Sequence, residues 1–239
     1  MLMKNQIGRT LFWFRNGEND LSYLDYKFFS VGLLLNRFLN ETYKGKTKEF
    51  INIYLCTEET YRLYPKVAKY HLHSTGSIIN YYDVFDLYNF NSLDFENQKQ
   101  FLWRRGYEIL QLAAKESKNP ALLEACNYAY EKGLKIGLNP DFKLLETKVI
   151  LHDTEVNACL WIKFYDKLDL MKAIFTLEKN EVTVFEKLID EATIGIEFFL
   201  EIYKKIEAKG NSIIIKGHHE IDYLPMKIPI SADTINKSL

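Results

Sequence analysis

The clearest candidates for metal or acid–base chemistry in the first half of the chain are two histidines at alternate positions, His71 and His73. On a strand, residues two apart project from the same face, so both imidazoles would lie together, as they do in many metal sites. A metal site needs further ligands, but residues 74–77 (Ser-Thr-Gly-Ser) supply no carboxylate and no third histidine. We therefore expect the pair to be surface imidazoles on a half-exposed strand, with no metal.

The second candidate is the segment 217–223, the densest polar cluster of the chain. If it is extended, His218, Glu220 and Asp222 would share one face and His219 the other. Histidines and carboxylates so close together can serve as general acids and bases. If the first histidine pair joined them, the chain would be a metal-dependent hydrolase or another enzyme, and this is the alternative hypothesis. The simpler expectation is a polar loop that leaves a buried strand.

No sequence motif of a common enzyme class accompanies these residues. The chain has no GxSxG elbow, no Walker loop, no GxGxxG fingerprint and no HExxH helix. The cysteines at 56, 126 and 159 form no CxxC pair, and each lies in an apolar stretch, which is typical of buried thiols. We therefore expect no cofactor and no metal, and the balance of the sequence favours a protein without enzymatic activity.

Aromatic residues are unusually frequent, with 16 Tyr, 16 Phe and 3 Trp in 239 residues. Several tyrosines share short segments with acids, and aromatic area can anchor a partner while carboxylates steer its approach. For any single tyrosine the simpler expectation is a place at the core edge with only the hydroxyl in water. As a group they predict a surface for a basic protein partner. The predicted residues are Tyr23, Tyr26, Tyr81, Tyr82, Asp83, Asp86, Tyr88, Tyr128 and Tyr130.

The first 90 residues, which must position most of these side chains, have a β-α-β-β-β pattern. Apolar residues predict strands at 10–14 and 50–56, and at 66–73 and 77–82 on either side of a turn. Between the first two, apolar residues at helical spacing over 21–38 predict a helix. Two further helices, 93–117 and 120–136, are expected to form an αα-hairpin. Asn119-Pro120 marks the start of the second helix.

The second half predicts a sheet. Residues 142–188 contain β-rich runs separated by turns at 153–154, 166–167 and 179–180, the pattern of a four-stranded antiparallel meander. An amphipathic helix is expected over 189–209, with Ile194, Phe198, Ile202 and Ile206 on one stripe, followed by a strand at 212–216. The fold class is therefore α+β, an antiparallel sheet with packed helices. We expect one compact unit over 1–239, with subdomains 1–90, 91–139 and 140–239.

Charge and hydropathy narrow the functional class. The 31 basic and 32 acidic residues give a net charge of -1, which provides no basic footprint for nucleic acid. Apolar runs are too short for a membrane helix, and the start shows no secretory signal, so we expect a cytoplasmic protein without membrane contact. In general character the chain looks like bacterial immunity proteins. That likeness implies a cytoplasmic protein that neutralises a cognate toxin by occluding its active site. The partner would then be a basic toxin domain.

Overall fold

The chain divides into two compact units. The computed structural model describes residues 6–165 and 170–236, and the units are Met1–Pro140 and Asp141–Leu239. The boundary follows Pro140, one residue after the limit expected between the subdomains 91–139 and 140–239. Helices and sheets are both present, with one mixed and two antiparallel sheets, so the predicted α+β class is confirmed.

The N-terminal unit is built on a mixed sheet in the order β1-β2-β4-β3. The strands β1 (Ile7–Arg15), β2 (Lys48–Cys56) and β4 (Ile78–Val84) run parallel. Two helices cross over between β1 and β2, and a helix and the strand β3 lie between β2 and β4 in the chain. The short strand β3 (His71–Thr75) pairs antiparallel with β4 through a tight turn at Gly76. We expected strands joined by tight turns to be antiparallel. Within this sheet, that expectation is met only by β3 and β4.

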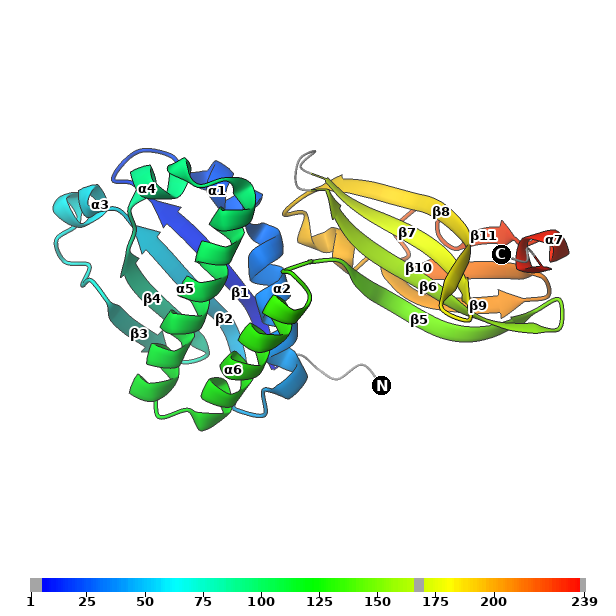
Figure 1. Cartoon of the computed structure of the whole chain (residues 1–239), viewed down its shortest axis with the longest axis horizontal. Coiled ribbons are helices and arrows are strands. Elements are labelled where there is room, and N and C mark those ends of the chain that lie inside the picture. The colour runs from blue at the N-terminus through cyan, green and yellow to red at the C-terminus, as the bar shows by residue number, and fades with distance from the viewer. Residues whose placement is uncertain (1–5, 166–169, 237–239) are drawn as a thin grey trace. The chain divides into compact units, whose positions relative to one another are not determined.

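A layer of helices covers one face of this sheet (Figure 1). The two long helices α5 and α6 form the predicted αα-hairpin, and the Asn119 side chain caps α6 by accepting a hydrogen bond from Leu122 N. The single helix expected after the first strand is divided at Phe28 into α1 and α2. The helices are α1 (Ser22–Lys27), α2 (Phe29–Thr42), α3 (Glu58–Leu63), α4 (Leu87–Ser92), α5 (Phe95–Glu116) and α6 (Pro120–Lys135).

Phenylalanine rings fill much of the space between sheet and helices. Phe14, Phe28, Phe85 and Phe90 are buried, and the centroid of the Phe90 ring lies 5.1 Å from Phe85, 5.5 Å from Phe28 and 5.8 Å from Phe14. Aromatic pairs at these distances add to the free energy gained from burial alone. A large share of the aromatic surplus is therefore ordinary core.

Side chains close the outer edge of β1. Asn40 accepts a hydrogen bond from Ile7 N at 2.9 Å and donates one to Ile7 O at 2.8 Å. The buried Asn36 donates to Gly8 O at 3.1 Å, and Asp25 accepts from Phe14 N at 2.7 Å. These backbone groups of the edge strand thus have partners without a further strand.

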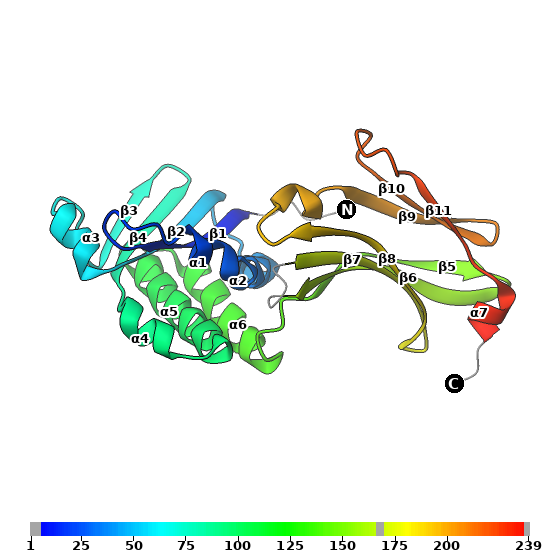
Figure 2. The ribbon, with the colours of Figure 1, turned by 90° about the horizontal axis from the view of Figure 1, so that it is seen from above.

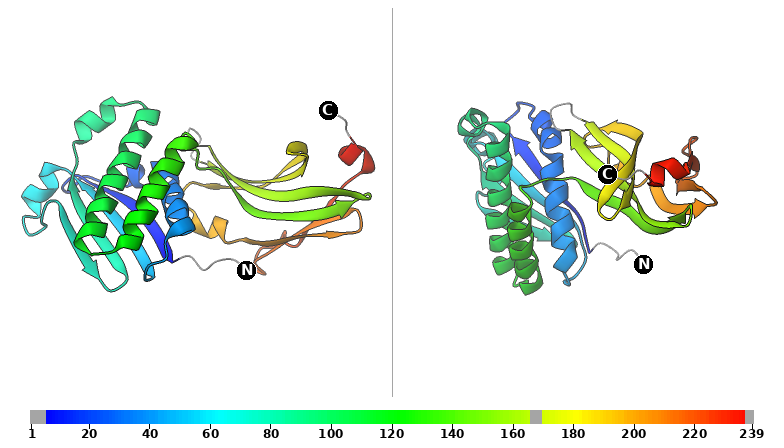
Figure 3. Two further views of the ribbon diagram at one scale, coloured as in Figure 1. Left: turned by 60° about the horizontal axis from the view of Figure 1, so that its bottom comes forward. Right: turned by 45° about the vertical axis from the view of Figure 1, so that its right-hand side comes forward.

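The C-terminal unit contains the predicted meander, opposed by a second, three-stranded antiparallel sheet (Figure 3). The order β5-β6-β7-β8 confirms four sequential antiparallel strands, and the expected turn at 166–167 lies outside the described residues. The elements are β5 (Phe142–Leu151), β6 (Thr154–Tyr165), β7 (Leu170–Lys179), β8 (Val182–Thr193), β9 (Tyr203–Lys209), β10 (Ser212–Gly217), β11 (Met226–Pro229) and α7 (Ala232–Asn236).

The helix predicted over 189–209 is wrong. The strand β8 continues to Thr193, Gly195 adopts φ +93°, and only a short 3-10 helix, Glu197–Leu200, precedes β9. Gly210 does not end a helix but forms the turn of a hairpin, in which Lys209 pairs with Ser212. The apolar spacing that suggested a helix instead places Ile202 and Ile206 in the core of the unit. Among the described residues, no helix combines the length and apolar character needed to cross a membrane.

Candidate functional site

The histidines singled out by the sequence lie in different units. His71 and His73 are exposed on β3 in the N-terminal unit, where His73 Nε2 lies 3.0 Å from Thr75 Oγ1. In the C-terminal unit the ring of His218 stacks on that of His219, with centroids 4.7 Å apart. Neither unit gathers the two sets into one site.

The polar segment after β10 is mostly exposed, as expected of a loop. Glu220, Asp222 and His219 are exposed, and His218 is half-buried against Phe198, with ring centroids 5.7 Å apart. The only ion pair in the described part of the segment joins Glu220 Oε2 to His218 Nδ1 at 3.7 Å. Neighbouring Tyr223 donates a hydrogen bond to Asp190 at 2.6 Å, which ties the loop to β8.

One group of potential metal ligands does converge in the C-terminal unit. The ligand atoms of Glu146, Cys159 and Glu178 lie within 4.8 Å of one another. However, the Lys143 ammonium lies 2.8 Å from Glu146 and 3.0 Å from Glu178, so both carboxylates already have a cationic partner. Burial raises the pKa of the Cys159 thiol to about 12, which disfavours the thiolate that a metal would need. We therefore interpret this group as an ion-pair cluster.

Two of the predicted interface residues lie in the core. Tyr81 is 2% exposed and Asp83 is fully buried. The Asp83 carboxylate receives two hydrogen bonds from the Arg105 guanidinium, each at 2.5 Å. Hydrogen bonding to Asp83, and to a lesser extent to Glu108, raises the pKa of Arg105. Asp83 is thus the buried member of an ion pair with the partly exposed Arg105 and not an acid that steers a partner.

The other predicted interface residues lie on several elements. Tyr23 and Tyr26 are exposed on α1, and Tyr88 on α4 is 84% exposed. Asp86 caps α4 by accepting a hydrogen bond from Asn89 N at 3.0 Å.

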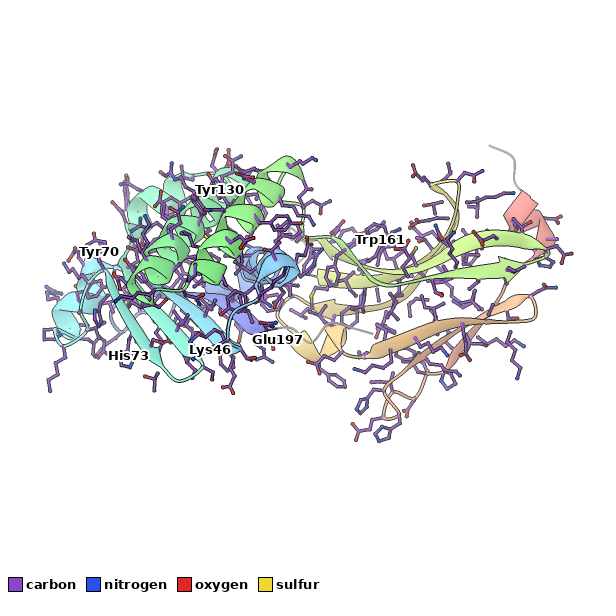
Figure 4. All side chains as sticks on the ribbon, turned by 90° about the horizontal axis from the view of Figure 1, so that it is seen from below. Lys46, Tyr70, His73, Tyr130, Trp161 and Glu197 are labelled. Carbon is purple, nitrogen blue, oxygen red and sulfur yellow. The ribbon has the colours of Figure 1, made fainter. Side chains whose placement is uncertain are left out.

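The two predicted tyrosines of α6 are held by neighbours in the helix layer. The Tyr128 hydroxyl donates to Glu41, and the Tyr130 ring stacks on Tyr107 with centroids 4.1 Å apart. Figure 4 labels Tyr130 on this helix side and His73 on the sheet side of the N-terminal unit. Only Tyr82, which follows Tyr81 on β4, belongs to the surface described next.

The uncovered face of the N-terminal sheet carries aromatic and basic side chains. Helices of this unit pack against the other face, and no helix of residues 6–140 covers this one (Figure 2). We call it the open face. Strand register, together with the alternation of side chains along each strand, places on it Arg9, Leu11, Trp13 and Arg15 of β1, Lys48, Phe50, Asn52 and Tyr54 of β2, Ile78, Asn80 and Tyr82 of β4, and His71, His73 and Thr75 of β3. All of them are at least partly exposed.

Three aromatic rings form a ladder across the middle of the open face. Trp13, Tyr54 and Tyr82 are paired in register on neighbouring strands. The Tyr54 and Tyr82 rings are 4.8 Å apart at 9°, and the Trp13 and Tyr54 rings are 6.4 Å apart at 20°. Because the rings stack on one another, the two faces of Tyr54 are occupied, which leaves ring edges as the part available to a partner. Burial raises the pKa of Tyr54, so its hydroxyl remains protonated at neutral pH.

A row of amides beside the ladder fixes its geometry. Trp13 Nε1 donates a hydrogen bond to Asn52 Oδ1 at 2.9 Å, and Asn52 Nδ2 donates to Asn80 Oδ1 at 2.8 Å. A chain of side-chain hydrogen bonds across three strands restricts the rotamers of these residues. The open face is therefore pre-organised, and a partner that binds it loses less conformational entropy.

The charged side chains that belong to the open face are cations, and one of them, Arg15, pairs with Asp25 of α1 at 3.1 Å. Arg9 lies over the Phe50 ring at 5.8 Å and Arg15 over the Trp13 ring at 5.3 Å. Lys48 adds a third cation at the start of β2. No Asp or Glu belongs to the described residues of the open face. Its chemistry is therefore that of aromatic contact, amide hydrogen bonding and cationic attraction.

Sequence reasoning missed this surface because it depends on strand register. Trp13 and Tyr82 are 69 positions apart in the chain, and only the parallel pairing of β1, β2 and β4 brings them together. A signal was present in β2, where Asn52 and Tyr54 alternate with buried Ile53 and Leu55.

Comparisons of the chain with protein-family models, with curated proteins and with solved structures return no match.

Proposed function

We propose that this protein is a non-enzymatic protein-binding protein and that the open face contacts the partner. The observation that carries the proposal is the pre-organised ladder of Trp13, Tyr54 and Tyr82 on an uncovered sheet face. Trp, Tyr and Arg are the residues that most often dominate the energetics of protein interfaces. Sheets of parallel strands are usually covered on both faces, so a partner would supply the missing layer.

The sequence profile adds a more specific form of this function. A bacterial immunity protein that occludes the active site of a cognate toxin needs a rigid surface and no catalytic groups of its own. The amide row of Asn52 and Asn80 supports the first requirement, because it holds the ladder in place before binding. On this proposal the open face covers the toxin, and inhibition is steric.

The proposal is tested with the product of the adjacent gene, co-expressed and purified with this chain as a binary complex. Isothermal titration calorimetry of the full chain should give a Kd that rises about 30-fold or more for Tyr54→Ala, as expected for an interface hot spot. Tyr88→Ala removes a more exposed tyrosine from α4 and is the matched control. If Tyr54→Ala folds and binds like the parent protein, the open face is not the binding surface.

A further inference from the structure

We propose that two copies of this chain associate through the free edge of β3, as an antiparallel pair of strands related by a two-fold axis. The strand β3 is the last in the order β1-β2-β4-β3, so one of its sides has no neighbouring strand in the N-terminal sheet. Figure 4 labels His73, the middle residue of this strand. The association goes beyond the proposed function, because it uses the edge of the sheet and not the aromatic ladder of the open face.

The hairpin between β3 and β4 determines which backbone groups point to the free edge. Thr75 and Ile78 pair across a two-residue loop, in which Gly76 adopts φ +58°. The residues that flank such a loop exchange backbone hydrogen bonds with each other, and bonded and non-bonded pairs then alternate along the ladder. The odd-numbered residues of β3 therefore bond to β4. The N–H and C=O groups of Leu72 and Ser74 point to the free edge.

These outward groups have no hydrogen-bond partner among the described residues. The β1 edge of the same sheet differs, because Asn36, Asn40 and Asp25 bond to its backbone. Edge strands are commonly protected by lysine, by proline or by a bulge, and β3 has none of these. With five residues it is short, which predicts a weak association.

The outward groups of β3 are symmetric about His73, and a second copy matches them. With His73 on the two-fold axis, Leu72 of each copy lies opposite Ser74 of the other, and the two pairs exchange four backbone hydrogen bonds. A register centred on Leu72 would pair Ser74 with Tyr70, whose φ of +52° is not that of a strand. A register centred on Ser74 would pair Leu72 with Gly76 of the turn. Only the register centred on His73 uses all the outward groups within the strand.

The side chains of β3 are compatible with this register. In the dimer His73 faces its own copy, and His71 faces Thr75 of the other copy. An imidazole and a hydroxyl already interact within one chain, where His73 Nε2 lies 3.0 Å from Thr75 Oγ1. The strand contains no Asp, Glu, Lys or Arg, so no permanent like charges oppose one another across the axis. Antiparallel pairing joins the two sheets into one, with both open faces on the same side.

Analytical ultracentrifugation of the full chain tests the association. We expect a reversible monomer–dimer equilibrium with a Kd between about 10 µM and about 1 mM, because the contact is small. Ser74→Pro removes one outward N–H from each copy and should raise the Kd at least about tenfold. Proline is accepted at an edge position whose N–H faces solvent, so the monomer should fold. Ser74→Ala keeps the N–H and is the matched control.

Two results of this experiment would overturn the proposal. One is a chain that remains monomeric at about 1 mM. The other is the same Kd for Ser74→Pro and Ser74→Ala. Because no partner protein takes part, either result would leave the proposed function of the open face in place.

Charge variants at position 73 test the two-fold axis. His73→Glu and His73→Lys each place like charges opposite one another, and each should weaken the dimer about fivefold. An equimolar mixture of the two variants should associate as heterodimers at least as well as the parent chain does. Such rescue is expected only for a residue that meets its own copy. If the mixture associates no better than either variant alone, the register is wrong.

Disulfide formation gives a measurement that does not depend on affinity. In the proposed register the two Cα atoms at position 73 lie about 4.5 Å apart, which a disulfide can span. The two Cα atoms at position 71 are offset by roughly 13 Å along the strand, which a disulfide cannot span. His73→Cys should form a covalent dimer under mild oxidation, and His71→Cys should not. The native cysteines are buried, so the parent chain is the blank, and equal cross-linking of the two variants would contradict the proposal.

Discussion

Two exposed sheet faces of this protein differ in how they arrange charged and aromatic side chains. The outer face of the β5-β6-β7-β8 sheet, which includes Trp161 in Figure 4, pairs its cations with carboxylates. Lys143 contacts Glu146 and Glu178, and Lys172 lies 3.2 Å from Glu191 on the neighbouring strand. The open face of the N-terminal sheet has cations and stacked rings but no carboxylate of its own among the described residues.

The difference separates a face whose charged side chains are paired across strands from a face whose exposed area is largely aromatic. Cross-strand ion pairs stabilise a solvated sheet face by modest amounts and need only water above them. Stacked aromatic rings on a sheet face without a covering layer leave apolar area exposed to solvent. Exposure alone does not identify a binding surface. The test is whether the groups on the surface are already complementary to one another.

The largest expected effect comes from giving the open face a carboxylate. Asn80→Asp keeps an oxygen that accepts the hydrogen bond from Asn52, so the fold should be preserved. A carboxylate at the centre of the bound surface would lose its hydration without a counter-charge, which should cost about 3 kcal/mol of binding free energy, or more than about 100-fold in Kd. Calorimetry of the binary complex measures this change.

The control for that variant lies on the helix layer. Asn127 also accepts side-chain hydrogen bonds, from Tyr107 and Gln111, and it is exposed. Asn127→Asp should leave the Kd unchanged. Equal losses for Asn80→Asp and Asn127→Asp would mean that the charge of the whole chain, and not the open face, governs binding.

A smaller effect is expected when the outer face of the C-terminal sheet loses its central cation. Lys143→Met removes charge-assisted hydrogen bonds from Glu146 and from Glu178, whose side chain is 12% exposed. We expect a loss of about 1–2 kcal/mol in the free energy of unfolding. Lys48→Met, on the open face, should change it by less than about 0.5 kcal/mol, since Lys48 donates to a solvated carbonyl.

Denaturation of the full chain, followed through the indole signals of Trp13 and Trp161, reports on the two units separately. The Lys143→Met loss should affect the Trp161 transition, while the Trp13 transition stays in place. Similar stabilities for Lys143→Met and the parent protein would show that the outer face does not depend on its ion pairs, and the contrast between the faces would be lost.

The pH dependence of stability should follow Glu178. Burial by itself would raise the pKa of this carboxyl, but hydrogen bonds from Lys143 and Trp161 outweigh burial, and the pKa is lowered from the ordinary value of 4.5. A group with a lowered pKa stabilises the fold above its unfolded pKa and loses that contribution as pH falls through the folded value. The free energy of unfolding reported by Trp161 should therefore fall below about pH 4.5. The fall should be smaller in Lys143→Met. Parallel pH profiles for the two proteins would contradict this assignment.

The smallest effect is expected for an exposed pair of the same sheet. Lys172 and Glu191 are directly opposite in register on β7 and β8, and the Glu191 side chain is half exposed. Lys172→Gln should cost about 0.2–1 kcal/mol, and added salt should reduce that cost. Unfolding at low and high salt measures it. A cost that persists at high salt would indicate that the aliphatic stem of Lys172, and not its charge, contributes the stability.

Local patterns in the sequence predicted much of the fold. Asn119-Pro120 correctly marked the start of α6, and alternating β-rich runs with turns identified the meander. The helix expected over 189–209 failed because Ile202 and Ile206 satisfy both a helical and an extended pattern. What decided between them was the pairing of β9 with β10, a tertiary interaction that periodicity does not contain.

The candidate surface was harder to predict than the elements that form it. Tyr82 was singled out together with Tyr81 and Asp83, but alternate residues of a strand point to opposite faces, so its neighbours went into the core. Trp13 and Tyr54 gave no joint signal, because they meet only through the parallel register of β1 and β2. The prediction that nearby acids accompany the tyrosines failed for a similar reason. Asp83 is close to Tyr81 and Tyr82 along the chain, but its carboxylate is buried and pairs with Arg105.

The side chains that line the outer edge of β1 have a consequence for the behaviour of the protein at high concentration. Asn36, Asn40 and Asp25 occupy backbone groups that another strand would otherwise use. An unprotected edge of this kind is a template for edge-to-edge aggregation. Two amides and one carboxylate thus block the addition of a strand at the β1 edge. The short, polar β3 is the other edge of the N-terminal sheet, where a strand could still be added.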